Sequence, residues 1–184
     1  FLSTGGLQLG DHLFRDWKVG GHGITNVSKA LAWSVNTFFY YIGGGYADFV
    51  GLGVDRLVKY SKLFGLGVKT GIDLPNEAAG NINSLFIDGA ADIDFASASF
   101  GQSIAVSPIA MIRALSTLAN KGRLPEPHLV KAIRFETGLV RDVAQADPVQ
   151  VIKPETAEMV TNMLVTVYDK ALLEGALKQE HYSI

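Results

Sequence analysis

Ala30-Leu31-Ala32-Trp33-Ser34-Val35-Asn36-Thr37-Phe38-Phe39-Tyr40-Tyr41 is the stretch that decides the fold of this chain. Apolar residues at three-and-four spacing predict an amphipathic helix over about residues 25–42. Inside this apolar run stand one hydroxyl, at Ser34, and one carboxamide, at Asn36. Buried polar side chains need hydrogen-bond partners, so these two residues are the first candidates for a functional site.

Two interpretations of Ser34 and Asn36 follow from helix geometry. In an unbroken helix, residues two apart point roughly 200° apart around the axis, so the two side chains would not face one ligand. They would then be ordinary helical residues, satisfied by backbone carbonyls or water. Alternatively, the backbone breaks between two short helices, and both side chains turn toward a cleft.

Composition limits the possible classes of protein. The chain has 184 residues, of which 48% are hydrophobic and 18% charged, which indicates one folded domain, possibly with two lobes. A net charge of −2 with dispersed Lys and Arg gives no basis for nucleic-acid binding. Cysteine is absent, which excludes disulfides, thiolate metal sites and a cysteine nucleophile. No apolar run is long enough to span a bilayer, and we expect no cofactor or metal.

Glycine, proline and apolar spacing predict the other elements. Residues 1–24 are rich in glycine, and we interpret them as a surface connection with a short aromatic anchor. The other expected elements, in chain order, are a helix over 54–64, a loop over 65–77, an irregular segment over 81–96, a helix with Ser107 as its N-cap and Gly122 beyond its end, a strand over 128–135 returning over 139–143, and a helix over 154–168. This last helix is expected to bury Met159, Met163, Leu164 and Val167.

Three local patterns imitate ligand sites. Val68 stands where a phosphate-binding loop needs glycine before Lys69-Thr70, and the glycines of this segment also fail the dinucleotide fingerprint. His22 lies between glycines with no ligand-like spacing to another histidine, which favours a loop histidine. The acids of residues 88–94 lack the spacing of an EF-hand loop.

Several ordered motifs together resemble the transpeptidase domain of class B penicillin-binding proteins, over almost the whole chain. They are Gly20-Gly21-His22-Gly23, Ser34-Val35-Asn36, Phe64-Gly65-Leu66-Gly67 with Thr70-Gly71-Ile72-Asp73-Leu74-Pro75 and Glu77, Ser99-Phe100-Gly101-Gln102 with Val106-Ser107-Pro108, Ala119-Asn120-Lys121-Gly122, and Pro127-His128-Leu129-Val130.

The resemblance implies an α+β fold of the penicillin-binding-protein and serine β-lactamase type, represented here mainly by its helical lobe. It also implies an extracytoplasmic enzyme, anchored to the bacterial membrane by a segment outside this chain, that cross-links peptidoglycan stem peptides and is acylated by β-lactam antibiotics. Such enzymes combine a Ser-x-x-Lys nucleophile, a Ser-x-Asn element and a Lys-Thr-Gly strand. Ser34-Val35-Asn36 matches the second of these, which would make Ser34 a proton relay and Asn36 a hydrogen-bond donor or acceptor to the substrate amide. The implied protein partners are cell-wall elongation or division proteins.

The other two elements are not matched. No serine lies three residues before a lysine anywhere in the 184 residues. Lys69-Thr70-Gly71 is followed by Ile-Asp-Leu-Pro and lacks the alternating pattern of a strand. We therefore expect residues 1–184 to be a partial transpeptidase domain, inactive alone, with Ser-x-x-Lys upstream and Lys-Thr-Gly directly downstream, so that Tyr182-Ser183-Ile184 begin that strand.

Two other functions remain open. One is a relative without a nucleophile that serves as a binding or scaffold domain in cell-wall assembly. The other is a stand-alone serine hydrolase that uses Ser34, although no Lys or His is placed by the sequence to activate it.

Overall fold

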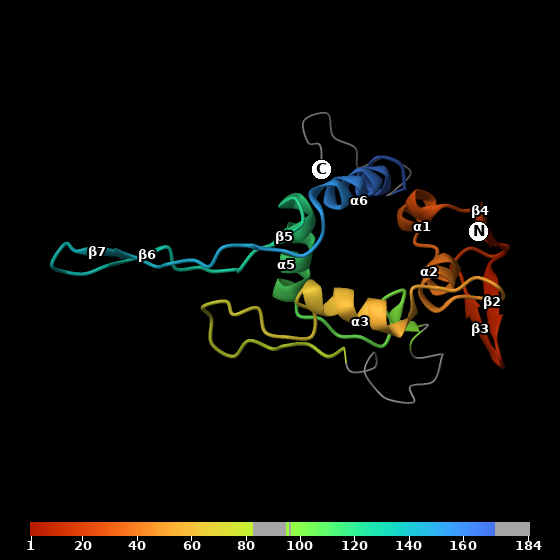
Figure 1. The fold of residues 1–184 in the computed structure, drawn as a ribbon, viewed down its shortest axis with the longest axis horizontal. Helices are drawn as coiled ribbons and strands as arrows, with labels where there is room; N and C mark the ends of the chain where they lie inside the picture. Colours follow the sequence, from red (N-terminus) through yellow and green to blue (C-terminus); the bar gives the residue numbers. More distant parts are fainter. Residues whose placement is uncertain (83–94, 96, 172–184) are drawn as a thin grey trace. The chain divides into compact units, whose positions relative to one another are not determined.

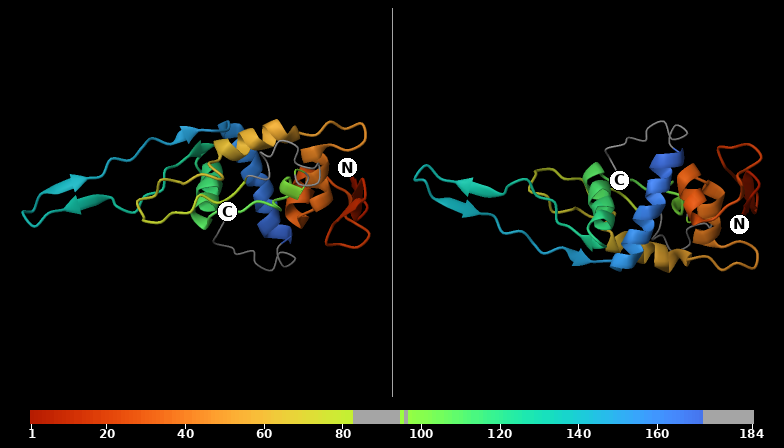
Figure 2. Two further views of the ribbon diagram at one scale, coloured as in Figure 1. Left: turned by 90° about the horizontal axis from the view of Figure 1, so that it is seen from below. Right: turned by 90° about the horizontal axis from the view of Figure 1, so that it is seen from above.

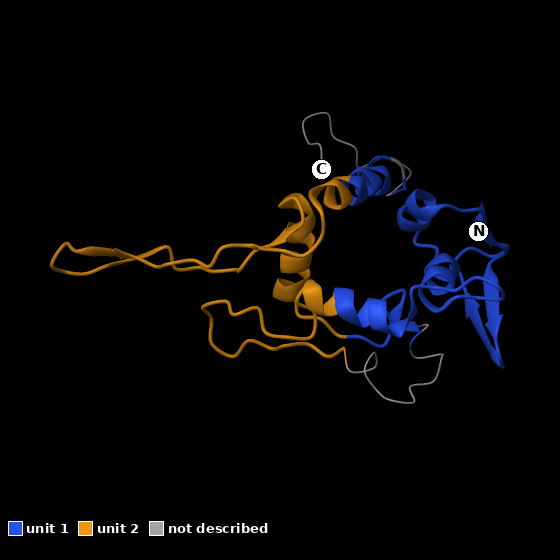
Figure 3. Ribbon diagram, in the orientation of Figure 1, with its two compact units in different colours: residues 1–60, 83–104, 159–184 blue, residues 61–82, 105–158 orange. Residues whose placement is uncertain are grey.

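The computed structural model describes residues 1–82, 95 and 97–171. The chain divides into two compact units, the first formed by residues 1–60, 83–104 and 159–184 and the second by residues 61–82 and 105–158 (Figure 3). The irregular acidic segment and the expected strand start at residues 182–184 lie outside the described residues, apart from a few positions of the former.

The first unit begins with two small antiparallel strand pairs. β1 (Leu2–Ser3) pairs with β4 (Gly23–Ile24), and β2 (Gly6–Leu9) pairs with β3 (His12–Arg15). In the second pair Leu7 lies opposite Phe14, and both are buried in a cluster with Tyr40. The prediction of a surface connection over residues 1–24 was therefore wrong. The missed signal was the alternation of Leu7, Leu9, His12 and Phe14 around Gly10-Asp11, a typical hairpin turn.

The expected helix over residues 25–42 is broken in two, as the second interpretation required. α1 (Val27–Trp33) begins after Asn26, whose side chain accepts a hydrogen bond from the Lys29 N–H at 2.9 Å. α2 (Asn36–Gly44) follows after a two-residue interruption, and Figures 1 and 2 show the two helices as separate segments. Val35, fully buried with Ala30 and Phe38, fixes the connection in the core.

Two helices cross the boundary between the units. α3 (Gly53–Leu63) matches the expected helix over 54–64, and α6 (Pro154–Thr166) matches the expected helix over 154–168 except at its end. There the chain continues as a π-helical turn, η2 (Val167–Ala171), which contacts α1. Met159 is 59% exposed, so its predicted burial was wrong, whereas Met163, Leu164 and Val167 are half-buried. Ala157, one turn before Thr161, is the residue of α6 that is buried instead.

The second unit is built around α5 (Pro108–Ala119), which starts at the predicted cap Ser107. β5 (Arg123–Leu124) pairs with β8 (Val149–Gln150). The hairpin of β6 (Ala132–Arg134) and β7 (Val140–Asp142) lies between these two strands in the sequence, and Figure 1 shows it projecting away from α5 and β5. The expected strand over 128–135 and its return are therefore present but shorter than predicted. Backbone pairing begins only after Val130, because the amides of Leu129 and Val130 are bound to Asp73.

The loop over residues 65–77 is confirmed, and two of its backbone amides bind a side chain of the same loop. Thr70 is buried, and its N–H and hydroxyl donate to Glu77 at 2.7 and 2.6 Å, with the Gly71 N–H also donating at 3.1 Å. The amides that would cradle an anion are thus turned toward a carboxylate of the same loop. Asp73 accepts the Leu129 and Val130 N–H groups at 2.7 Å each, which fixes the loop to the start of the hairpin.

This loop should respond to acid. Hydrogen bonds from the Thr70 hydroxyl and backbone N–H favour the charged carboxylate and lower the pKa of Glu77 from its usual value. The stabilisation that these hydrogen bonds give the loop is therefore complete above the usual pKa of glutamate. It is lost as the pH falls through the lowered pKa of Glu77. We expect a carboxyl ¹³C NMR titration to place the Glu77 midpoint below that of glutamate in an unfolded peptide.

Thr70→Val provides the control for this titration, because it removes the hydroxyl donor and keeps the shape of the side chain. The Glu77 midpoint should then move back toward the peptide value. An unchanged midpoint in Thr70→Val would contradict the assigned cause.

Candidate active site

The candidate site is the interruption between α1 and α2. Ser34 ends α1 in the left-handed conformation, with φ 50° and ψ 55°, and the Val35 N–H donates to the Ala30 carbonyl at 3.0 Å. The left-handed region costs a non-glycine residue roughly 1–2 kcal/mol, so this serine is held there by its surroundings. The backbone turns sharply at Ser34 because α1 stops there and α2 starts two residues later.

The two candidate side chains have no hydrogen-bond partner among the described residues. Ser34 is exposed and Asn36 is half-buried. Within the described part of the chain, neither side chain makes a hydrogen bond to protein. The helix is interrupted between the two residues, so the unbroken helix that the first interpretation assumed is wrong. Because polar groups placed at a helix break without protein partners are available to substrate, the arrangement suits recognition or proton transfer.

Asp16 holds the start of α2 from a distant part of the sequence. Its carboxylate accepts the Thr37 N–H at 3.0 Å, the Thr37 hydroxyl at 2.7 Å and the Ser3 hydroxyl at 2.8 Å. The N-cap residue Val35 has no side-chain acceptor of its own, so Asp16 supplies one, and its negative charge is favourable at a helix N-terminus. Sequence reasoning missed Asp16, because its partners lie 13 and 21 residues away and no local pattern marks it.

Trp17 contacts the other side of the interruption. Its indole Nε1–H donates to the carbonyl oxygen of Trp33, the last residue of α1, at 2.7 Å. The last carbonyls of a helix lack internal partners, and this bond satisfies one of them. The Trp17 ring also packs edge-on against His22, with ring centroids 5.2 Å apart.

His22 is a loop histidine, as expected, but it is buried. The backbone N–H of His22 donates to the Ser3 hydroxyl oxygen at 3.0 Å, and its backbone carbonyl accepts a hydrogen bond from the Lys29 ammonium. Burial lowers the pKa of His22, with the Lys18 and Lys29 charges acting in the same direction and Asp16 opposing them. The imidazole is therefore neutral at pH 7. Among the described residues no group of three metal-ligating side chains is found.

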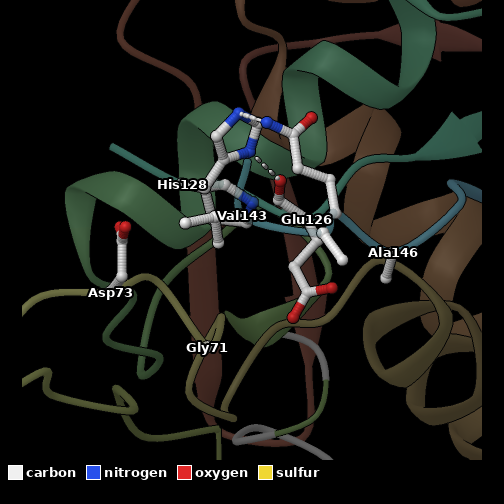
Figure 4. Close-up of a pocket in the computed structure, with 9 residues that line it drawn as sticks. Gly71, Asp73, Glu126, His128, Val143 and Ala146 are labelled. Carbon is white, nitrogen blue, oxygen red and sulfur yellow. Dashed lines mark hydrogen bonds between the residues drawn. The ribbon is translucent and has the colours of Figure 1, made fainter. Parts of the chain in front are cut away.

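The second unit holds a separate small cavity of about 150 Å³, lined mainly by residues of the loop and the hairpin base (Figure 4). His128 lies at its edge, with Nδ1 against the Glu126 carbonyl and Nε2 against the Gln145 amide. Both ring nitrogens of His128 therefore have a polar partner. Asp73, on another wall, has both oxygens bound by backbone N–H groups, which lower its pKa. The ionisable groups Asp73 and His128 therefore already have partners.

Comparison with known proteins gives a single family. The family model for the penicillin binding protein transpeptidase domain matches residues 2–184. Peptidoglycan D,D-transpeptidase MrdA of Haemophilus influenzae is 35% identical over 131 residues, which cover 65% of this chain and 19% of that protein. Stage V sporulation protein D of Bacillus subtilis is 32% identical over 170 residues, which cover 91% of this chain and 25% of that protein. The chain thus spans a fifth to a quarter of the length of these relatives.

Solved structures agree on the fold. Penicillin binding protein 3 of Mycobacterium tuberculosis, complexed with aztreonam, superposes with a TM-score of 0.78 at 24% identity, covering 91% of this chain and 36% of that one. A peptidoglycan synthetase from Bifidobacterium adolescentis gives a TM-score of 0.75 at 21% identity, covering 92% and 30%. The predicted α+β fold of the penicillin-binding-protein type is confirmed.

Proposed function

The chain belongs to the class B penicillin-binding protein transpeptidase family, and from this premise we propose that it is part of a peptidoglycan D,D-transpeptidase that cross-links stem peptides by serine acyl transfer. The observation that carries the proposal is the helix interruption, at which Ser34 and Asn36 have no hydrogen-bond partner among the described residues, in a chain that matches the family from residue 2 to 184. Relatives named as peptidoglycan D,D-transpeptidases support it.

We propose the following acyl transfer for the whole enzyme. A serine outside residues 1–184 gives its hydroxyl proton to the neighbouring lysine and attacks the carbonyl of the penultimate D-alanine, which forms an ester. The terminal D-alanine leaves as its nitrogen gains a proton. Ser34 passes that proton through its hydroxyl, from the lysine beside the nucleophile to the leaving nitrogen. Asn36 hydrogen-bonds the substrate amide. An amine of a neighbouring stem peptide then attacks the ester, which releases the serine and completes the cross-link.

We also propose that residues 1–184 form only part of the catalytic domain. The chain contains no Ser-x-x-Lys, and Lys69-Thr70-Gly71 lies in a loop rather than a strand. On α5, Met111, Ile112 and Leu115 are 44%, 59% and 53% exposed. A helix of a stable domain normally buries such an apolar face, so this exposure supports a missing layer, which the rest of the domain would supply.

The proposed partners and location follow from the same function. Stem peptides are the substrates, β-lactams act as inhibitors that acylate the serine, and cell-wall elongation or division proteins are the protein partners. The enzyme works on the outer side of the bacterial membrane, anchored by a segment outside this chain. Among the helices of the described residues, none has the length and hydropathy needed to cross a bilayer.

The test is to locate the β-lactam adduct. The intact protein, meaning the full product of the gene that encodes residues 1–184, is incubated with a β-lactam, digested and mapped by mass spectrometry. We expect the adduct on a serine outside residues 1–184, and none on the isolated 184-residue chain.

Two other outcomes would contradict the proposal, each in favour of an alternative. An adduct on Ser34 would indicate a stand-alone serine hydrolase. A folded intact protein that forms no adduct would indicate a binding or scaffold relative without a nucleophile. Circular dichroism of the same preparation separates this second case from a protein that failed to fold.

A further inference from the structure

The interruption that presents Ser34 and Asn36 is not stable by itself. α1 has seven residues and α2 nine, both shorter than the length at which isolated helices persist in water. Ser34 occupies a left-handed conformation that serine disfavours. Something outside the two helices must therefore fix the direction of the chain between them.

Two consecutive residues, Asp16 and Trp17, contact both sides of the interruption. Asp16 binds the N–H and hydroxyl of Thr37, directly after Asn36, and Trp17 binds the carbonyl of Trp33, directly before Ser34. Two adjacent residues thus contact the end of α1 and the start of α2. Hydrogen bonds to a charged group are among the stronger ones in proteins, and Asp16 is only 8% exposed.

Asp16 is itself fixed to the strands of the first unit. The backbone N–H of Asp16 donates to the Gly5 carbonyl at 3.0 Å, and its carboxylate accepts a hydrogen bond from the Ser3 hydroxyl. The Ser3 hydroxyl oxygen in turn accepts a hydrogen bond from the backbone N–H of His22. Ser3 is 1% exposed and Thr37 is fully buried, so water does not compete for these bonds. The network runs without interruption from the β1 and β4 strands to the first turn of α2.

We propose that Asp16, assisted by Trp17, is a positioning residue of the active site, which holds Ser34 and Asn36 in one orientation for proton transfer and substrate binding. This inference rests on the proposed function. Asp16 itself touches no substrate. A hydroxyl that relays a proton must keep its place within a fraction of an ångström, and small misplacements at such sites lower rates strongly.

The test compares two buried threonines of equal exposure. Thr37→Val removes the hydroxyl bonded to Asp16, whereas Thr117→Val removes a hydroxyl that donates to the Arg113 carbonyl in the second unit at 3.1 Å. Thr37→Ser keeps the Thr37 hydroxyl. In the intact protein we expect Thr37→Val to lower the β-lactam acylation rate constant about tenfold, in line with one lost charge-assisted hydrogen bond. Thr37→Ser and Thr117→Val should react at the wild-type rate.

Asp16→Asn provides the second arm, with a readout that needs no activity. In the wild-type protein the Thr37 amide should be protected from hydrogen exchange, and Asp16→Asn should reduce that protection while the amides of α5 stay unchanged. Saturation kinetics complete the test, because a positioning role lowers the acylation rate constant more than it weakens non-covalent binding of the antibiotic.

The outcomes of this test separate the inference from the proposed function. Equal rates in wild type and Thr37→Val, or equal loss in Thr37→Val and Thr117→Val, would overturn the positioning role. Unchanged Thr37 exchange in Asp16→Asn would also overturn it, even in a protein that no β-lactam acylates. A wild-type protein without an adduct contradicts the proposed function alone, since the exchange comparison still decides the role of Asp16.

Discussion

Ser34→Ala is expected to lower the acylation rate of the intact protein by about 10²–10⁴-fold, the range that a positioned proton-transfer group contributes. The reason is chemical. The leaving nitrogen of a peptide or β-lactam must be protonated as the bond breaks, and alanine carries no proton to pass on. Folding should be unaffected, because Ser34 is exposed and its hydroxyl makes no hydrogen bond to the described residues. The measurement is stopped-flow acylation with a chromogenic β-lactam.

Ser28→Ala is the matched control for Ser34→Ala, since Ser28 is a half-exposed serine of the same helix. It should react at the wild-type rate. A Ser34→Ala protein that is acylated as fast as Ser28→Ala would remove Ser34 from the proposed mechanism. Complete loss of antibiotic binding together with a lower melting temperature would instead indicate that Ser34 is structural.

Gly21→Ala is expected to lower the free energy of unfolding by about 4 kcal/mol or more. Single substitutions cause losses of this size only when they disrupt core packing, a buried charge or the backbone conformation. Gly21 has φ +78°, and a Cβ there would collide with the backbone of Ser3, Thr4 and Gly5. These atoms belong to the start of the chain that carries the Ser3 and Asp16 network, so they have little freedom to move away. Chemical denaturation of the intact protein measures the loss.

Gly20→Ala separates the collision from the backbone preference. Gly20 has nearly the same φ, +79°, but a Cβ there meets no atom within 4 Å. It should cost only the roughly 1–2 kcal/mol that a left-handed conformation costs a residue with a side chain. Equal losses in Gly20→Ala and Gly21→Ala would show that close backbone packing at Gly21 contributes nothing.

The helix break was one of two alternatives that the sequence left open, and the signal for it is a local conflict. Ser34 and Asn36 stand two residues apart in an apolar run, and only an interruption lets both leave the core. The N-cap residues Asn26 and Ser107 each accept a hydrogen bond from a backbone N–H three residues later. Because this signal is local, the starts of these helices were also close to the predicted positions. The support of the break was not predictable, because Asp16 and Trp17 act across long sequence separations.

Several motifs that carried the family resemblance hold segments of the fold together by hydrogen bonds. In the Thr-Gly-Ile-Asp-Leu-Pro segment, Thr70 binds Glu77, while Asp73 binds the amides of Leu129 and Val130. Two motifs more than 50 residues apart in sequence are thus one hydrogen-bonded unit. Lys69-Thr70-Gly71 illustrates the limit of motif matching, because this stretch lies in a loop where Thr70 and Gly71 bind Glu77 rather than in a strand.

The β6–β7 hairpin consists entirely of exposed residues from Lys131 to Asp142, joined only to itself by backbone pairing. An isolated two-stranded hairpin is marginally stable, so its opening and closing need not involve the rest of the molecule. Its base is closed by the β5–β8 pair. Changes of length in such an arm carry little more than a loop-closure cost, about 0.6 kcal/mol for each doubling. This segment is therefore where insertions and deletions can accumulate during evolution while the machinery around Ser34 is inherited intact.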